Sequence, residues 1–85
     1  MMVSKDRYAH DDDTVVFDAM SETASRLIGL YAARADSADT PEEEKQWMGE
    51  VIRVRDGLRA TDPHDRAAMR RNMDRWADEY KRLER

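Results

Sequence analysis

The sequence has no cysteine and little glycine, proline or aromatic side chain: 3 Gly, 2 Pro and 7% aromatic residues in a chain of 85. Without cysteine there is no disulfide, thiol nucleophile, zinc–thiolate site or iron–sulfur cluster. The glycines are isolated, at Gly29, Gly49 and Gly57, so the chain lacks a phosphate-binding loop or dinucleotide fingerprint. No apolar run approaches the roughly 18 residues of a membrane helix. The chain therefore gives no indication of a nucleotide cofactor, and we predict that no segment crosses a membrane.

What remains is a helix-forming composition. Charged residues make up 40% of the chain and hydrophobic residues another 40%, and Ala, Leu, Glu, Arg and Met favour helix over strand. The length fits one domain. No secretory signal is visible at the start of the chain, and we therefore expect a cytoplasmic protein.

Three segments have apolar residues at helical spacing. We expect residues 1–12 to be a flexible acidic tail and residues 13–85 to form the domain. The first helix is predicted at about 14–35, with Asp13 or Thr14 as its N-cap. Its apolar stripe consists of Phe17, Met20, Ala24, Leu27 and Tyr31, widened by Val16 and Ile28.

The second helix has the most specific start signal in the chain. Thr40 is suited to the N-cap, Pro41 to the first helical position and Glu43 to the N3 position, which together form a capping box. The helix either ends near Asp56 with Gly57 as its cap or continues to about Ala60, and we favour continuation because Leu58 remains in register. Its stripe consists of Trp47, Val51, Val54 and Leu58, flanked by Met48 and Ile52.

The third helix is predicted to begin at Pro63, with Asp62 as N-cap. Its stripe consists of Met69, Met73, Trp76, Tyr80 and Leu83, and we expect the two tryptophans and most methionines to fill the core. Stripes with alternating spacings of three and four pack at shallow angles, and short connections make neighbouring helices antiparallel. The sequence therefore predicts an all-α protein, an antiparallel three-helix bundle.

The residues do not point to catalysis. No serine lies in a nucleophile elbow, and the consecutive carboxylates at 42–44 are explained by the helix start. The acidic run after His10 lacks the glycine and distal glutamate of a calcium loop, and His64 is expected at the surface. We therefore expect no enzyme activity, metal, cofactor or small-molecule substrate. An enzyme remains an alternative only if several copies of the chain assemble and enclose a shared pocket.

Charge is unevenly distributed along the chain. Residues 1–50 have 5 basic and 12 acidic residues, whereas residues 51–85 have 10 basic and 7 acidic residues. Pairing between helices explains this pattern best. The alternative is a nucleic-acid-associated accessory protein whose arginines contact phosphates; its candidate residues are Arg59, Arg66, Arg70 and Arg71. The acidic pI of about 5.1 argues against this alternative.

The width of the first two stripes favours a protein-interaction module. A single narrow third helix does not cover both of the others, and surplus apolar surface commonly marks an interface. We predict that the chain is an adaptor, inhibitor or regulatory subunit that binds another protein or itself, and that a homodimer forms through the first two helices. The candidate partner-binding residues are Val16, Ile28, Met48 and Ile52.

Overall fold

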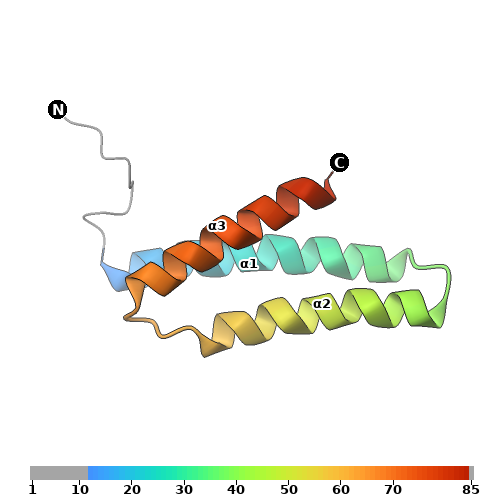
Figure 1. Cartoon of the computed structure of the whole chain (residues 1–85), viewed down its shortest axis with the longest axis horizontal. Helices are drawn as coiled ribbons and strands as arrows, with labels where there is room; N and C mark the ends of the chain where they lie inside the picture. The colour runs from blue at the N-terminus through green and yellow to red at the C-terminus, as the bar shows by residue number, and fades with distance from the viewer. Residues whose placement is uncertain (1–11, 85) are drawn as a thin grey trace.

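The computed structural model describes residues 12–84, and this part of the chain is an all-α bundle of three helices, as predicted (Figure 1). Helix α1 spans Asp13–Asp36, α2 spans Pro41–Ala60 and α3 spans Arg66–Leu83. No helix among residues 12–84 has the length and apolarity that a membrane span requires. The predicted flexibility of residues 1–12 concerns residues that, apart from Asp12, lie outside the described ones.

Helix α1 is the centre of the bundle. Its backbone packs closely against α2 and against α3, whereas the backbones of α2 and α3 are not in close contact in the described residues. Figure 1 shows α1 and α2 running antiparallel side by side, while α3 diverges from them toward the C-terminus. The α1–α2 pair is consequently covered by α3 on one side only.

The core is formed by side chains from all three helices. Its buried members are Val16, Met20, Ala24, Leu27, Tyr31, Val51, Val54, Met69 and Trp76. Most of these residues lie on the predicted stripes. One expectation was wrong: Val16 is fully buried, whereas Phe17 is only partly buried. The buried face of α1 is therefore centred about one residue away from the predicted stripe at its start. Met48, unlike Met20 and Met69, is exposed and does not belong to the core.

The start of α2 confirms its predicted cap. The Glu43 backbone N–H donates to Thr40 Oγ1 at 3.1 Å, and Pro41 is the first helical residue. The Glu43 carboxylate accepts from the backbone N–H of Asp39 at 3.3 Å, one residue before the expected partner. The helix also continues through Gly57 to Ala60, as favoured from the sequence.

The other two helix starts differ from the predictions by one and three residues. Asp12 caps α1 by accepting from the Val15 N–H at 3.0 Å, in place of Asp13 or Thr14. Asp65 caps α3 by accepting from the Ala68 N–H at 3.0 Å, in place of Asp62.

Asp62 instead begins a turn that precedes α3. Its carboxylate accepts from the His64 N–H at 2.8 Å, and its carbonyl accepts from the Asp65 N–H at 3.0 Å. A proline in the second position is typical of such turns and also of helix starts, so the residue types around Pro63 suit both structures. The turn displaces the start of α3 to Arg66.

Candidate functional site

The largest exposed apolar side chains on α2 are Met48 and Ile52. Met48 is 40% exposed and Ile52 is 44% exposed. Because they are four residues apart, they lie next to each other on one side of the helix. We call the exposed surface formed by Met48, Ile52 and their exposed neighbours Glu44, Lys45, Arg55 and Asp56 the outward face of α2.

This face points away from α3. Gly57 lies against Trp76 of α3, and Arg53 is bound to Glu79 of α3, so the row of α2 that contains residues 53 and 57 faces the third helix. At 100° per residue, Ile52 is displaced by 100° from Arg53, and Met48 lies opposite Gly57 on the helix. In the described structure α3 therefore does not cover the outward face.

The structure separates the four predicted partner-binding residues. Met48 and Ile52 are exposed, as a binding surface requires. Ile28 is partly buried and packs against the core from α1. Val16 has 0% exposure and belongs to the core, so a partner cannot reach it on the folded chain. Val16 was assigned from the width of the apolar stripe alone, which does not show which edge of the stripe faces inward.

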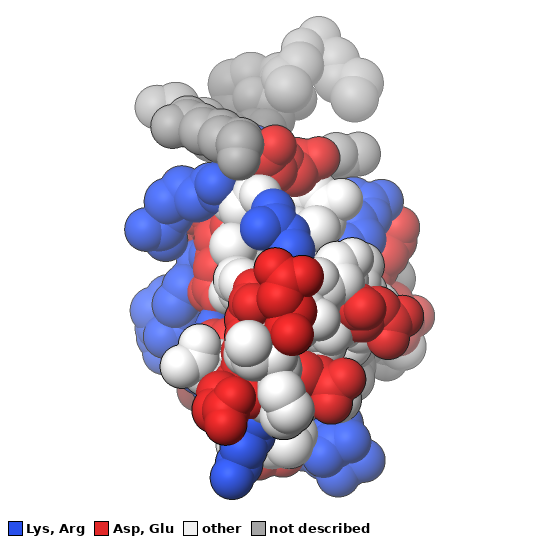
Figure 2. Space-filling view, turned by 90° about the vertical axis from the view of Figure 1, so that its right-hand side faces the viewer, with Lys and Arg blue, Asp and Glu red and all other residues white. Residues whose placement is uncertain are grey.

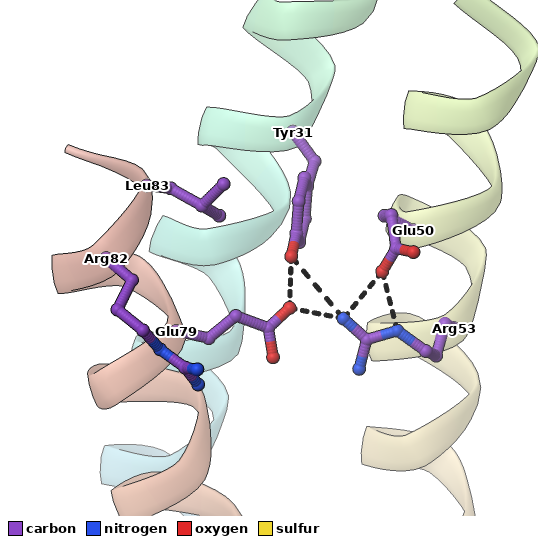
Figure 3. Close-up of a pocket in the computed structure, with 6 residues that line it drawn as sticks. All are labelled: Tyr31, Glu50, Arg53, Glu79, Arg82 and Leu83. Carbon is purple, nitrogen blue, oxygen red and sulfur yellow. Dashed lines mark hydrogen bonds and ion pairs between the residues drawn. The ribbon is translucent and has the colours of Figure 1, made fainter. Parts of the chain in front are cut away.

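A second candidate is an open groove of about 480 Å³ between α2 and α3, with α1 as its floor (Figure 3). Tyr31 comes from α1 and is buried, and polar side chains from the other two helices surround its hydroxyl. The lining residues are Tyr31, Glu50, Arg53, Glu79, Arg82 and Leu83.

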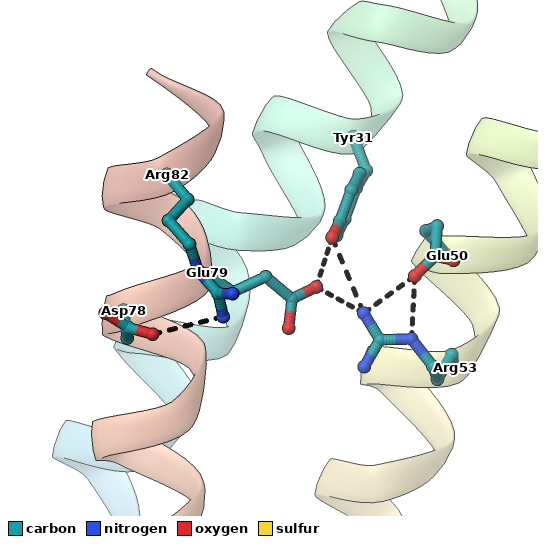
Figure 4. Close-up of polar contacts among 6 residues, drawn as sticks. All are labelled: Tyr31, Glu50, Arg53, Asp78, Glu79 and Arg82. Carbon is teal, nitrogen blue, oxygen red and sulfur yellow. Dashed lines mark hydrogen bonds and ion pairs between the residues drawn. The ribbon is translucent and has the colours of Figure 1, made fainter. Parts of the chain in front are cut away.

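The polar groups of this groove bind one another (Figure 4). The Tyr31 hydroxyl donates to Glu79, and Arg53 donates to the same carboxylate. Arg53 also pairs with Glu50 at 2.7 Å. These contacts connect all three helices, because Tyr31, Arg53 and Glu79 come from α1, α2 and α3 respectively. Outside this cluster, Arg82 pairs with Asp78 of its own helix at 3.1 Å, as their spacing suggests.

The cluster shifts the pKa of two of its members. Burial and the hydrogen bond to Glu79 raise the pKa of Tyr31 to about 12, so the hydroxyl remains a donor at neutral pH. Burial opposes the charged form of Arg53, but the hydrogen bonds to Glu50 and Glu79 outweigh this effect, and the pKa of Arg53 rises. Both shifts stabilise the protonation states that hold the cluster together.

Sequence reasoning missed this cluster. Glu79 lies four residues after Arg75, a spacing typical of ion pairs within a helix, but its carboxylate is bound to Arg53 and Tyr31. Only the Glu50–Arg53 pair, three residues apart on α2, was detectable in the sequence. The contacts of Glu79 depend on the rotation of α3 about its axis and on its axial position relative to α2, and spacing along one helix determines neither.

The two tryptophans have different surroundings. Trp76 is 2% exposed and belongs to the core, as predicted. Trp47 is only partly buried, and its ring lies 5.8 Å from the ring of Tyr31, at an angle of 31°. The Arg34 guanidinium lies 5.8 Å from the centre of the Trp47 ring, in the range of a cation–π contact. Trp47 thus closes the edge of the core beside the groove.

The four arginines of the nucleic-acid alternative do not have the same surroundings. Arg66 is partly buried and pairs with Asp13 at 3.1 Å, which joins α3 to the start of α1. Arg59, Arg70 and Arg71 are exposed, the first on α2 and the other two on α3. Arg66 therefore has a structural contact that links the acidic and basic halves of the chain.

Acidic side chains are concentrated at the end of the bundle where α1 connects to α2. Figure 2 looks onto the end formed by the α1–α2 connection, where acidic side chains occupy the centre of the view and basic ones lie mainly at its edge. The exposed acidic residues of this region are Asp36, Asp39, Glu42 and Glu44. No group of three or more potential metal ligands is found within residues 12–84. In the acidic run that follows His10, Asp12 caps α1 and Asp13 pairs with Arg66, whereas His10 and Asp11 lie outside the described residues.

Comparison of the chain with protein-family models, curated proteins and solved structures gave no match.

Proposed function

We propose that this chain is a non-catalytic protein-interaction module that acts through the outward face of α2, and that its partner is a second copy of the chain. The observation that supports this proposal is the exposed pair Met48 and Ile52, on a side of α2 that α3 does not cover. Amphipathic helices bury such rows against another helix, in the same chain or in a partner.

The groove between α2 and α3 supports the non-catalytic part of the proposal. Its Tyr31, Arg53 and glutamate side chains donate to and accept from one another. A catalytic acid or base has to face a substrate in a cleft, whereas these groups contribute to packing of the helices. The proposed location is the cytoplasm, where a chain without cysteine has no disulfide to lose.

Light scattering at tens of micromolar protein tests the proposal. We expect a mass near twice the 9.9 kDa of the chain. Ile52→Glu should shift the mass toward that of a single chain without loss of helix content in circular dichroism, because this side chain is 44% exposed. Ser25→Glu introduces the same charge on an exposed part of α1 and should leave the dimer intact. A wild-type mass near 9.9 kDa would contradict self-association.

A further inference from the structure

The charges of the outward face of α2 form a self-complementary pattern about the midpoint of the apolar pair. From this pattern we infer that two copies associate through α2 in antiparallel orientation, about a two-fold axis between Met48 and Ile52. The inference rests on the proposed function, because it specifies how that surface meets its partner. Its evidence is the arrangement of four charged residues: Glu44, Lys45, Arg55 and Asp56.

The four charges form one row on each side of the apolar pair. Glu44 and Arg55 are eleven residues apart, as are Lys45 and Asp56, and eleven residues make close to three helical turns. Each pair therefore lies in a row parallel to the helix axis. Because Glu44 and Lys45 are consecutive, the two rows are about 100° apart, and Met48 and Ile52 lie between them. Each row has one acidic and one basic residue.

An antiparallel two-fold axis brings opposite charges together. The axis lies at the level of residue 50, so Met48 of one copy packs against Ile52 of the other, as paired core positions do in antiparallel coiled coils. Glu44 lies six residues before this level and Arg55 five residues after it. They thus meet across the interface with an axial offset of about 1.5 Å, the rise of one residue. Lys45 and Asp56 meet in the same way.

Symmetry decides which rows face each other. A two-fold axis perpendicular to the two helices brings each row next to the same row of the partner, so Glu44 faces Arg55 and Lys45 faces Asp56. The like-charged combinations, Glu44 with Asp56 and Lys45 with Arg55, lie on opposite sides of the apolar pair. In a parallel arrangement the two rows would face each other, so Glu44 would meet Lys45 and Arg55 would meet Asp56. That arrangement, however, would place Arg59, which is exposed and lies in the same row of α2 as the apolar pair, next to its own copy, and this like-charge contact opposes association.

The four side chains have no competing partners in the folded chain. All four are exposed, and within residues 12–84 none of them makes an ion pair. By contrast, Glu50 and Arg53, on the side of α2 that faces the groove, pair with each other at 2.7 Å. Intermolecular pairing of the outward charges therefore breaks no contact within one chain.

Charge reversal tests the pairing of Glu44 with Arg55. Glu44→Lys or Arg55→Glu alone converts two attractive contacts per dimer into repulsive ones, and each should raise the dimer dissociation constant about fivefold to tenfold. An equimolar mixture of the two variants should form a heterodimer with wild-type affinity, because both contacts are attractive again. The double variant, Glu44→Lys with Arg55→Glu, should regain homodimer affinity. Asp18→Lys and Arg71→Glu make the same charge changes at exposed sites away from the face and serve as controls.

Cross-linking tests the orientation separately. Because the chain has no cysteine, one introduced cysteine is the only thiol. A short bis-maleimide should link Glu44→Cys to Arg55→Cys in a mixture of the two chains and should give little product with Glu44→Cys alone. The mixture of Ser25→Cys with Arg55→Cys measures the background of random collisions.

The outcomes distinguish this inference from the proposed function. If wild type is a dimer that Ile52→Glu dissociates, but Glu44→Cys links to itself or the charge reversals have no effect, the antiparallel arrangement is wrong and the function remains supported. If wild type is a single chain in light scattering, both are wrong. Recovery of affinity in the mixed and double variants, together with linkage only between positions 44 and 55, supports the inference.

Discussion

The indole ring of Trp76 on α3 lies against the backbone of α2 at Gly57, where an added Cβ atom would lie 3.2 Å from Cζ2 of the ring. At the other two glycines an added Cβ atom would meet no atom within 4 Å. Trp76 itself is 2% exposed. Glycine inside a helix destabilises it by about 1 kcal/mol relative to alanine. At position 57 it leaves room for the ring that anchors α3.

Substitutions of the three glycines by alanine should therefore have different effects. At Gly29 and Gly49 a Cβ atom meets nothing within 4 Å, so alanine should raise the free energy of unfolding by about 0.5–1 kcal/mol. At Gly57 the gain in helix propensity is opposed by displacement of the buried ring, and we expect no increase. Urea unfolding of the three variants provides the comparison. An increase at position 57 equal to that at position 49 would show that the ring moves without cost.

Truncation of the two tryptophans should separate the centre of the core from its edge. Trp76→Ala leaves a cavity among fully buried residues and should cost about 3–5 kcal/mol in the free energy of unfolding. Trp47→Ala removes a partly buried ring and its contacts with Tyr31 and Arg34. Its cost should be smaller, at about 1–2 kcal/mol. Equal costs from denaturant titration would contradict this division of the core.

The sequence predicted those parts of the fold that depend on local spacing. The stripes at three and four residues identified all three helices, and the capping box at Thr40 located the start of α2. The start of α3 was wrong because Asp62 and Pro63 suit a turn as well as a helix start. Only the hydrogen bonds of Asp62 with the N–H groups of His64 and Asp65 distinguish the two.

The sequence predicted the exposure of some candidate site residues but not of others, because a residue's position on its own helix does not show how many other helices cover it. Met48 and Ile52 flank the α2 stripe and are exposed, whereas Val16 flanks the α1 stripe and is buried. The difference arises because α1 is packed against two helices and α2 closely against one. The contact of Glu79 with Tyr31 and Arg53 joins residues 48 and 26 positions apart, so spacing along one helix cannot predict it.

Stability should depend on pH through Tyr31 in the alkaline range. The pKa of Tyr31 is raised to about 12 in the folded protein, against about 10 for an unfolded tyrosine. Between these values the unfolded chain binds fewer protons than the folded chain, so the free energy of unfolding falls as pH rises. The stabilisation from this group is complete below about pH 10 and is lost as the pH rises to about 12.

Tyr31→Phe isolates this effect from the titration of other groups. The free energy of unfolding of wild type relative to Tyr31→Phe should be about 1 kcal/mol smaller at pH 11 than at pH 8. Denaturant titrations of both proteins at the two pH values measure the difference. Tyr80→Phe is the matched control, since Tyr80 is only partly buried. A difference that does not change with pH would show that Tyr31 titrates as it does in the unfolded chain.

The exposed arginines should not suffice for binding to DNA. Arg66 is paired with Asp13 at 3.1 Å, and Asp65 and Asp74 are exposed on or next to the same helix as Arg70 and Arg71. The chain has a net charge of −4, which opposes approach to a polyanion over a distance of about 8 Å at physiological salt. We therefore expect no shift of a duplex DNA in a gel at micromolar protein.

A shift that weakens steeply with added salt would contradict this expectation, because release of counterions from phosphates produces that dependence. In that case, Arg70→Glu combined with Arg71→Glu should abolish the shift, while Ile52→Glu should leave it unchanged, since Ile52 is an apolar side chain on a different helix from these two arginines. Loss of DNA binding in Ile52→Glu alone would show instead that dimerisation is needed to bring two arginine surfaces onto one duplex. The absence of a shift in wild type would agree with the expectation, and association with another copy of the chain would then remain the proposed use of the outward face of α2.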